Sequence, residues 1–464
     1  MEQNESKGLN ISTKSFLTAI IVILILMVLT YALTFLVPSG EYTRIDGKID
    51  MTAGFNSNVD GGISFLKWVL SPILVLTASG SGTLIAVIAF LLVIGGIFNA
   101  LDKCGLMRYM LNKTANKFSS VRYRLLAVVT LLFMAMGAMI GSFEEAVPLV
   151  PIVVALSISL GWDTLVGLGM SLLAIGCGFS SGICNPFTVG VAQEVAGLAM
   201  FSGIWMRLLS FVLIYILLMV FLYFYAKKVE RPVSQSGDQA GFTNDPKMDR
   251  GLTAFVVILG VGIAAIFSSS FIPALQDYTM IIVAVMFLAA GIASTLLCGM
   301  SCKDLGKDFV SGLVTILPAV LMILMASSIR YTMEEAKILD TLLHGAVQLT
   351  DKMPPWVVVE FIYLLVLGMN FFIPSGSAKA FMLIPLIVPV AQAVGISPQL
   401  CVLAFAFGDG FSNVFYPTNP VLLISLGLTD VSYGKWFKWS GKFQLVNLVL
   451  TSLLLQLALF VGYQ

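Results

Sequence analysis

The chain has 464 residues, of which 58% are hydrophobic and only 11% are charged, and its mean hydropathy is +0.97. Soluble domains are about 45–50% apolar and about 25% charged, so this composition excludes a water-soluble enzyme or binding domain. Lys and Arg number 26 against 25 Asp and Glu, so no basic excess points to nucleic acid. We therefore expect an integral membrane protein whose surroundings are lipid.

The chain begins with two apolar spans separated by a polar loop. A bilayer is crossed by about 20 apolar residues, and short loops rich in Lys and Arg remain in the cytoplasm. Residues 16–37 form the first span; lysines precede it and no signal-peptide cleavage site follows, so we expect a retained anchor with a cytoplasmic N-terminus. Residues 83–101 form the second span, and the basic segment after it, which runs to residue 124, is expected in the cytoplasm.

The apolar stretch 125–160 is interrupted by the polar run 141–145, which contains Ser142, Glu144 and Glu145. The two parts have about 15–18 residues each, which is short for a hydrocarbon core of about 30 Å. We interpret the stretch as a re-entrant hairpin with its polar tip at membrane depth. Irregular backbone is tolerated there only where it is buried in protein or lines a wet cavity.

The next apolar segment, 164–198, contains a glycine-rich run at 176–188 that includes Asn185, Pro186 and Thr188. Proline removes a backbone donor and breaks the helix before it, which frees carbonyl groups and starts a new helix N-terminus. Free carbonyls with Asn and Thr oxygens suit a small cation, and a helix N-terminus suits a carboxylate. A proline kink satisfied by neighbouring helices is the alternative.

The middle of the chain contains ordinary spans and one polar linker. A span at 202–226 leads into the linker 227–250, which is the one plausible boundary between two halves. Further spans are predicted at 252–272, 279–297, 313–333 and 445–461. The short Lys and Arg clusters between spans all fall on one side of the membrane, and the count leaves the C-terminus outside.

The second half contains a hairpin and a break of the same kind. The apolar stretch 355–394 is interrupted by a polar run holding Ser375, Gly376, Ser377 and Lys379. A later glycine- and proline-rich run holds Asp409, Asn413, Thr418, Asn419 and Pro420.

A shift of 234 residues superposes the two halves without gaps. The matched pairs include Ala146 with Ala380, Pro151 with Pro385, Gly161 with Gly395, Gly176 with Gly410, and Asn185-Pro186 with Asn419-Pro420. The charge count gives the matched spans 83–101 and 317–335 opposite directions. We therefore predict an all-α polytopic membrane protein with two inverted-topology repeats, re-entrant hairpins and broken transmembrane helices, an arrangement typical of secondary transporters.

The hairpin tips and the breaks supply the candidate site. The residues expected to contact substrate are Ser142, Glu144, Glu145, Asn185, Pro186, Thr188, Ser375, Gly376, Ser377, Lys379, Thr418 and Asn419. The candidates for a coupling ion, either Na⁺ or H⁺, are Ser142, Asn185, Ser377, Asp409, Asn413 and Asn419. No cofactor and no other metal are expected, because the six cysteines and the single histidine form no zinc pattern.

The adjacent carboxylates Glu144 and Glu145 are the most informative charges. A carboxylate near the bilayer centre costs about 2.5–3.5 kcal/mol on insertion scales, so it is usually functional. If the pair faces the cavity, it favours an amine or guanidinium; if it lies at the cytoplasmic mouth, it is solvated or paired with the basic segment. Lys379, at the position matching Glu145, is a countercharge for this pair or a partner for a substrate carboxylate.

Other charged residues receive simpler interpretations. Arg330 and Arg207 are expected to be anchors near the outer surface, and Asp163 is expected to cap a helix. Phe407-Gly408-Asp409-Gly410 is faintly similar to an intramembrane aspartyl protease motif, but no span supplies the second aspartate. No other hydrolase motif and no nucleotide-binding loop is present in the sequence, so we do not expect an enzyme.

The runs 141–145, 178–180 and 185–193, with 375–377 and 417–420 in the second half, resemble the YfcC-like branch of the DcuC family of bacterial inner-membrane carriers. Members carry either four-carbon dicarboxylates or basic amino acids of the arginine and ornithine type. The wider superfamily implies an elevator mechanism in a homodimer. On that model residues 125–200 and 355–430 are transport halves, and 1–124, 201–354 and 431–464 are scaffold.

The resemblance leaves the substrate open, and Glu144 and Glu145 favour one answer. A dicarboxylate would meet like-charge repulsion beside two carboxylates, whereas arginine or ornithine would be attracted. We therefore rank basic amino-acid antiport above dicarboxylate transport coupled to Na⁺ or H⁺.

Overall fold

The computed structural model of the protein describes residues 13–45, 48–49, 54–57, 59–78, 81–107, 109–110, 113, 121–139, 141, 143, 146–199, 201–231, 245–269, 279–349, 353–429 and 431–464. The described part is almost entirely helical. Its strands are two short antiparallel pairs, β1 (Glu41–Tyr42) with β4 (Phe55–Asn56) and β2 (Arg44–Ile45) with β3 (Lys48–Ile49). Both pairs lie in the polar loop that was expected between the first two spans.

The first half consists of helices and a loop region that follow the predicted order. They are α1 (Thr13–Leu36), α2 (Phe65–Val69), α3 (Ser71–Leu74), η1 (Val75–Thr77), α4 (Ser81–Lys103), α6 (Arg122–Met139), α7 (Leu149–Ser159), α8 (Thr164–Leu168), η4 (Gly169–Leu173), α9 (Ala174–Ser181), η5 (Pro186–Gly190), α10 (Val191–Val195) and α11 (Ile204–Val229). Both η4 and η5 are π-helical, so the first broken helix is irregular on both sides of its break.

The second half follows after two further helices, α12 (Pro246–Ser269) and α14 (Thr279–Leu297). It contains α15 (Cys302–Glu335), α16 (Leu339–Gln348), α17 (Pro355–Met369), α18 (Gly376–Ala393), α19 (Pro398–Asn413), α20 (Pro420–Gly427) and α21 (Tyr433–Phe460). The predicted span 279–297 coincides with α14. The spans predicted to start at 313 and 445 begin earlier, because serine caps at Ser301 and Ser432 extend both helices through polar turns beyond the apolar core.

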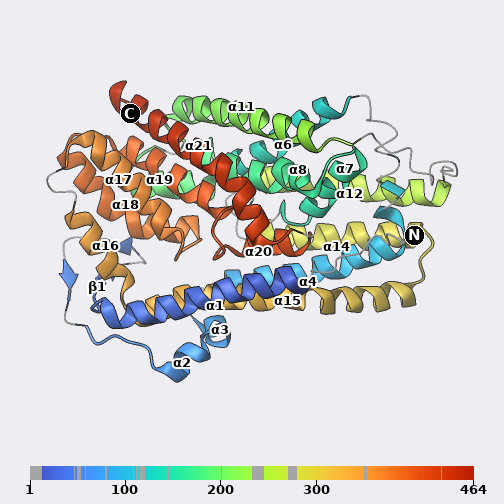
Figure 1. The fold of residues 1–464 in the computed structure, drawn as a ribbon, viewed down its shortest axis with the longest axis horizontal. Coiled ribbons are helices and arrows are strands. Elements are labelled where there is room, and N and C mark those ends of the chain that lie inside the picture. Colours follow the sequence, from blue (N-terminus) through green and yellow to red (C-terminus); the bar gives the residue numbers. More distant parts are fainter. Residues whose placement is uncertain are drawn as a thin grey trace.

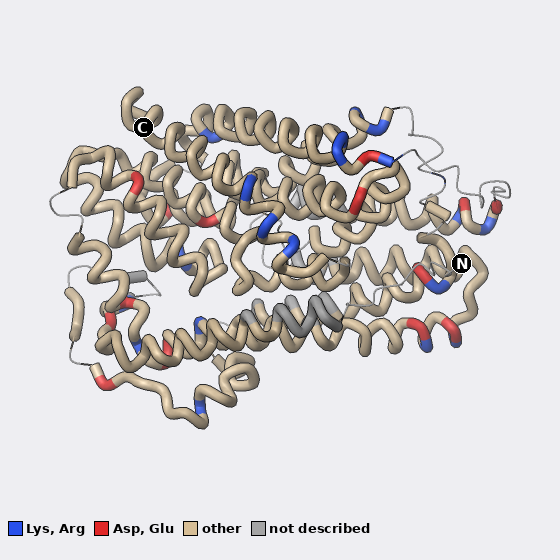
Figure 2. Tube along the Cα trace, viewed as in Figure 1, with Lys and Arg blue, Asp and Glu red and all other residues tan. Residues whose placement is uncertain are grey.

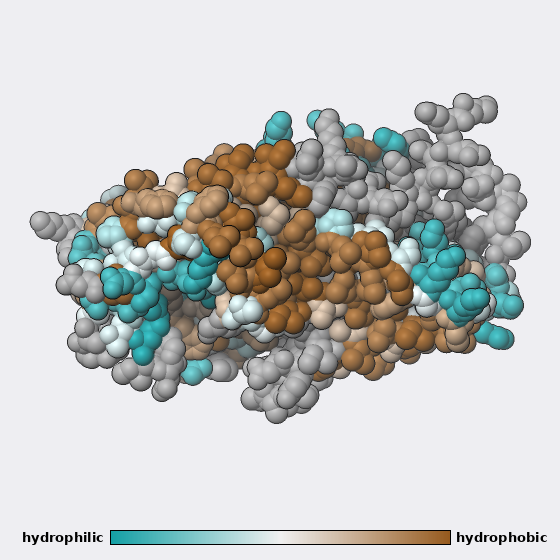
Figure 3. All heavy atoms as spheres, turned by 90° about the horizontal axis from the view of Figure 1, so that it is seen from below, coloured by the Kyte–Doolittle hydropathy of each residue, from teal (hydrophilic) through white to brown (hydrophobic). Residues whose placement is uncertain are grey.

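Six described helical segments are long and apolar enough to cross a membrane, and the molecule is a multi-pass membrane protein. Five of these segments have only 22–44% of their apolar window buried, so their outer faces are available to lipid. The segment Thr164–Val195 is 94% buried, which places the first broken helix inside the protein. Figure 3 shows the apolar surface as a band with hydrophilic patches toward both ends, and in Figure 2 most charged residues gather toward the ends of the long axis.

The helices form two groups that lie side by side. Helices α4, α12, α14 and α15 pack on one another, with α1 along α15. In Figure 1, α1, α4 and α15 lie in the lower part, α14 lies above them, and α12 lies higher, at the right. The hairpins, the broken helices, α11 and α21 form the other group. Hairpin 1 consists of α6 and α7, and hairpin 2 consists of α17 and α18. The short arms α7 and α17 have 11 and 15 residues, which is less than a full span needs.

The helix caps confirm the 234-residue repeat. Asp163 caps α8 and Ser397 caps α19, and the two positions differ by the repeat offset. Gly161 and Gly395, two residues earlier in each half, have positive φ angles of 85° and 83°. Glycine tolerates this conformation because it has no β-carbon, so both turns need it for the same reason.

The packing of matched helices shows that the repeats are inverted. A β-carbon added at Gly95 of α4 would approach Ile316 of α15, and Asn99 Nδ2 donates to the carbonyl of Asp308 at 2.6 Å. Residues later in α4 therefore meet residues earlier in α15, so the two helices run antiparallel.

The broken helices cross in the same antiparallel way. A β-carbon at Gly176 of α9 would lie 2.6 Å from Val414, and one at Gly410 of α19 would overlap Ser180. The repeat offset exchanges these contacts, since Gly176 matches Gly410 and Ser180 matches Val414. A two-fold relation between the halves has this property.

The breaks are shorter than the sequence indicated. The sequence assigned the glycine-rich run 176–188 and the later run that holds Asp409 to the breaks, but α9 continues to Ser181 and α19 continues to Asn413. The glycines in these turns lie inside the helices. They let a second helix approach closely, which is the role of small residues at membrane helix contacts. Only 182–185 and 414–419 interrupt the helices.

Candidate functional site

The two breaks end on asparagines with the same local geometry. Asn185 Oδ1 accepts from the amides of Phe187 and Thr188 at 2.9 and 3.3 Å. Asn419 Oδ1 accepts from the amides two and three residues later at 2.9 and 3.4 Å. Each asparagine is an N-cap, and the proline after it needs no donor partner at the first helical position. The Asn-Pro pairs thus start two buried helices inside the protein.

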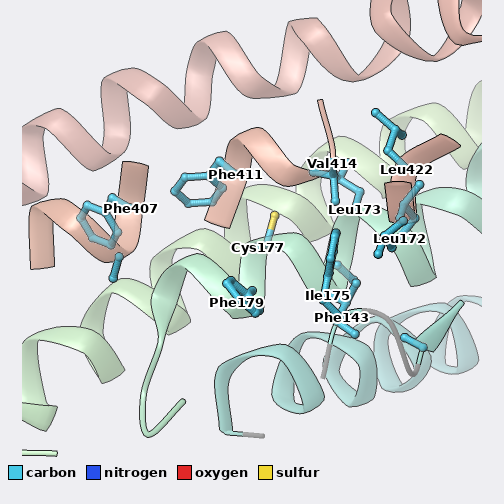
Figure 4. Close-up of a cluster of buried hydrophobic side chains, with 14 of the residues drawn as sticks. Phe143, Leu172, Leu173, Ile175, Cys177, Phe179, Phe407, Phe411, Val414 and Leu422 are labelled. Carbon is cyan, nitrogen blue, oxygen red and sulfur yellow. The ribbon is translucent and has the colours of Figure 1, made fainter. Parts of the chain in front are cut away.

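Each hairpin tip reaches a break. Gly141 has φ +72°, and a β-carbon there would clash with the side chain of Asn185. Phe143, two residues on, is 3% exposed and packs against Phe179 of α9 with 5.8 Å between ring centroids. Figure 4 shows Phe143 in one apolar cluster with side chains of α9 and α19. Hairpin 1 is therefore anchored to the first break.

The tip of hairpin 2 faces both halves. A β-carbon at Gly376 would touch Thr188 of η5 and would lie 2.7 Å from Asp409 Oδ2. Ser375 accepts a hydrogen bond from the amide of Ala378 at 3.4 Å and caps α18. Helix α18 also packs against η5 and α10 of the first half. Hairpin 2 thereby joins the two breaks in one site.

A buried ion pair lies behind this tip. Lys379 and Asp409 are both 0% exposed, and the Lys379 ammonium donates to Asp409 Oδ1 and to Asn370 Oδ1. The sequence placed Lys379 in an irregular tip, but it lies in the first turn of α18. Burying either charge alone costs several kcal/mol, so each requires the other to remain at this depth.

Asn370, at the end of α17, connects this ion pair with the second break. Its Nδ2 atom lies 2.6 Å from Ser412 Oγ and 2.9 Å from Asn413 Oδ1. Asn413 Oδ1 in turn accepts from Asn419 Nδ2 at 2.9 Å. The chain of hydrogen bonds holds hairpin 2, α19 and the second break in one arrangement.

Several buried polar atoms near the crossing have no hydrogen-bond partner among the described residues. They are Ser180 Oγ, Asn185 Nδ2, Thr188 Oγ1, Asp409 Oδ2 and Thr418 Oγ1. A buried polar group left unpaired costs about 1–3 kcal/mol, so native proteins rarely retain several in one place without a further partner. We therefore take these atoms, which lie around the two breaks and the tip of hairpin 2, as the candidate binding site.

The structure brings together many of the residues predicted for the site. Thr188, Gly376 and Asp409 meet between hairpin 2 and the first break. Asn185 joins them through the amide of Thr188, and Lys379 joins them through Asp409. Pro186 starts η5, Ser377 follows Gly376 in α18, and Asn413, Thr418 and Asn419 surround the second break. Ser142, Glu144 and Glu145 lie outside the described residues.

Sequence reasoning missed three buried residues. Asn370 lies in an apolar stretch and Ser180 in a glycine-rich run. The only sequence signal that could have identified them as site residues is a polar side chain at membrane depth. Arg207, which was expected to be a surface anchor, is 0% exposed. Its guanidinium donates to the carbonyls of Ile183 and Phe201 at 3.2 and 3.1 Å, so it binds the backbone within the first break and in the loop before α11.

A cavity of about 340 Å³ adjoins hairpin 2 on the side of the polar loop. Its wall includes Ala378 and Met382 of α18, together with Arg330 and Asp340. Arg330 forms an ion pair with Glu334 at 2.7 Å, and both residues line the cavity. The ion pair of Lys379 and Asp409 is fully buried, so this cavity ends short of the site.

The chain is similar to known membrane transport proteins. The family model for the C4-dicarboxylate anaerobic carriers, DcuC, matches residues 16–460. A protein of Escherichia coli strain K12 named "Putative basic amino acid antiporter YfcC" is 28% identical over 410 residues, covering 83% of this chain and 80% of that protein. An uncharacterized protein of Haemophilus influenzae strain Rd is 27% identical over 368 residues, covering 76% of this chain and 71% of that protein.

Two solved transporter structures cover nearly the whole chain at low similarity. The YdaH transporter of Alcanivorax borkumensis has 18% identity and a TM-score of 0.47, covering 97% of this chain and 99% of that one. MtrF of Neisseria gonorrhoeae has 16% identity and a TM-score of 0.45, covering 94% of each chain. With a family match that spans both hairpins and both breaks, the chain belongs to the DcuC family of C4-dicarboxylate anaerobic carriers and is a membrane transporter of the DcuC and YfcC type.

Proposed function

We propose that this transporter is a secondary antiporter of basic amino acids of the arginine and ornithine type. The observation that carries the proposal is the charge state of the candidate site. Lys379, the cation that a dicarboxylate would need, is already bonded to Asp409 and Asn370. Glu144 and Glu145, which follow Phe143 in the sequence, are expected to add negative charge to the site. A cationic side chain is attracted to such a site and a second carboxylate is repelled.

The remaining groups suit the amino-acid end of such a substrate. Helices η5 and α20 each begin at a break, and the partial positive charge at a helix N-terminus favours an α-carboxylate. Asp409 Oδ2 and Thr188 Oγ1 are unpaired among the described residues, and they can accept from an α-ammonium. The name of the Escherichia coli relative agrees with this substrate class.

Dicarboxylate transport is the second candidate, and two observations favour it. The matching family model describes C4-dicarboxylate carriers. Arg207 is buried beside the first break and bonds carbonyl groups and the hydroxyl of Tyr463. A guanidinium in that setting keeps further N–H donors for a carboxylate.

The mechanism we propose is an elevator in the cytoplasmic membrane of a bacterium, with a cytoplasmic N-terminus and an external C-terminus. Residues 125–200 and 355–430 move against the group formed by α4, α12, α14 and α15, which holds a homodimer together. If the tips approach the site from opposite sides, cysteines at Ser142 and Ser377 should each react with an impermeant thiol reagent from one side only. Labelling of either cysteine from both sides would contradict the inverted hairpins.

Counterflow in proteoliposomes tests the substrate. Vesicles loaded with unlabelled arginine, ornithine or succinate should accumulate labelled arginine only when they contain a basic amino acid. Accumulation of labelled succinate against internal succinate, without any arginine exchange, would overturn the proposal and leave the dicarboxylate carrier.

A further inference from the structure

The second half of the site contains a cation that belongs to the protein. The Lys379 ammonium lies against a carboxylate oxygen and an amide oxygen, at 0% exposure. Carboxylate and amide oxygens are the ligands that hard inorganic cations select in proteins. The ammonium therefore occupies a position that such an ion would otherwise take.

The hydrogen bonds around the pair hold this position in shape. Asn370 accepts from Lys379 and lies 3.0 Å from the carbonyl of Asp409, and it continues through Asn413 to Asn419 at the second break. One positive charge thus ties hairpin 2 to α19 and to the start of α20. Without it, the Asp409 carboxylate would be buried and uncompensated, which is strongly unfavourable.

The first half has no equivalent arrangement. The repeat offset places Met136 at the position of Asn370 and Ile175 at the position of Asp409. The pair is therefore a property of the second half alone.

We propose that Lys379 is a tethered counter-ion that replaces an inorganic monovalent cation at the second half-site, so that exchange proceeds without sodium binding there. This inference rests on the proposed antiport function for its transport readout. It predicts that a variant without the ammonium acquires a requirement for a small cation that the natural protein lacks.

The test compares the natural protein, Lys379→Ala and a control, Lys438→Ala, which removes an exposed lysine of α21. Arginine counterflow by the natural protein and the control should change less than twofold when sodium replaces choline in all buffers. Lys379→Ala should exchange at least tenfold more slowly in choline, and sodium or methylammonium should restore several-fold activity in a saturable way. A sodium requirement in the natural protein, or full activity of Lys379→Ala in choline, would overturn the inference.

Thermal unfolding of the purified proteins separates this inference from the substrate proposal. Sodium should raise the unfolding temperature of Lys379→Ala but leave that of the natural protein unchanged, whether or not arginine is the substrate. If Lys379→Ala is not recovered from the membrane, Lys379→Gln, which keeps a donor toward Asn370, is measured in the same way. If sodium does not raise the unfolding temperature of the variant that lacks Lys379, or raises it equally in both proteins, the tethered counter-ion is contradicted.

Discussion

The two halves of the site have similar backbone geometry but different side-chain chemistry. Each half has an asparagine cap followed by proline and a hairpin that reaches a break. In the second half the polar groups mostly satisfy one another, through Lys379, Asp409 and Asn370. In the first half, Ser180, Asn185 and Thr188 each keep a buried polar atom without a described partner. Asp409 Oδ2 and Thr418 Oγ1 are the atoms without a described partner that the second half adds. The comparison indicates that the second half organises the site through its ion pair, and that both halves offer free groups to the ligand.

The largest effect should come from breaking the organised half. Asp409→Leu leaves the Lys379 ammonium buried without its carboxylate, and breaking a buried pair in this way costs about 3–5 kcal/mol. We expect a marked fall in unfolding temperature in detergent and loss of transport. The double variant Asp409→Leu/Lys379→Met removes both charges and should recover most of the stability. A single variant as stable as the natural protein would show that the pair does not organise the second half.

The next effect concerns the charge at the first hairpin. Removing a carboxylate that pairs with a buried guanidinium should raise the apparent KM for arginine at least tenfold, which corresponds to about 1.4 kcal/mol. We expect this of Glu145→Gln, and the exposed Glu194→Gln in α10 serves as the control. Radiolabelled uptake measures both variants with arginine and with succinate. Unchanged arginine uptake, or improved succinate uptake, would favour the dicarboxylate alternative.

A smaller effect should follow from separating the two halves at their crossing. The methyl group added by Gly410→Ala would overlap atoms of Ser180, and overpacking of this kind costs about 1–3 kcal/mol. Gly368→Ala in α17 is the matched control, because no atom lies within 4 Å of the added carbon. We expect a lower unfolding temperature for Gly410→Ala and an unchanged or higher one for Gly368→Ala. Equal stability of the two variants would mean that α9 and α19 do not cross at this glycine.

The smallest effect distinguishes capping from ligand binding in the first half. Asn185→Ala removes an N-cap and should cost about 0.5–2 kcal/mol, whereas Asn185→Ser keeps a neutral capping oxygen. Asn185→Ser also removes the Nδ2 donor, which has no described protein partner. We therefore expect Asn185→Ser to retain stability but to lose substrate affinity in a binding assay. Normal affinity would assign Asn185 a structural role only.

The sequence by itself determined the all-helical membrane fold and the inverted repeat. Both follow from apolar spans and from matched residues such as Asn185-Pro186 and Asn419-Pro420, because these control local backbone structure and burial in lipid. Such properties depend on a few neighbouring residues, so they can be predicted from the residue pattern alone.

Only the tertiary structure decided which polar groups meet. The glycine-rich runs near 176 and 410 were assigned to the breaks, yet these glycines lie inside helices, where a second helix packs against each of them. The pairing of Lys379 with Asp409, 30 residues apart in the chain, depends on how α18 folds back on α19. Nothing in the local sequence specifies that contact, since its energy comes from excluding water around both charges at once.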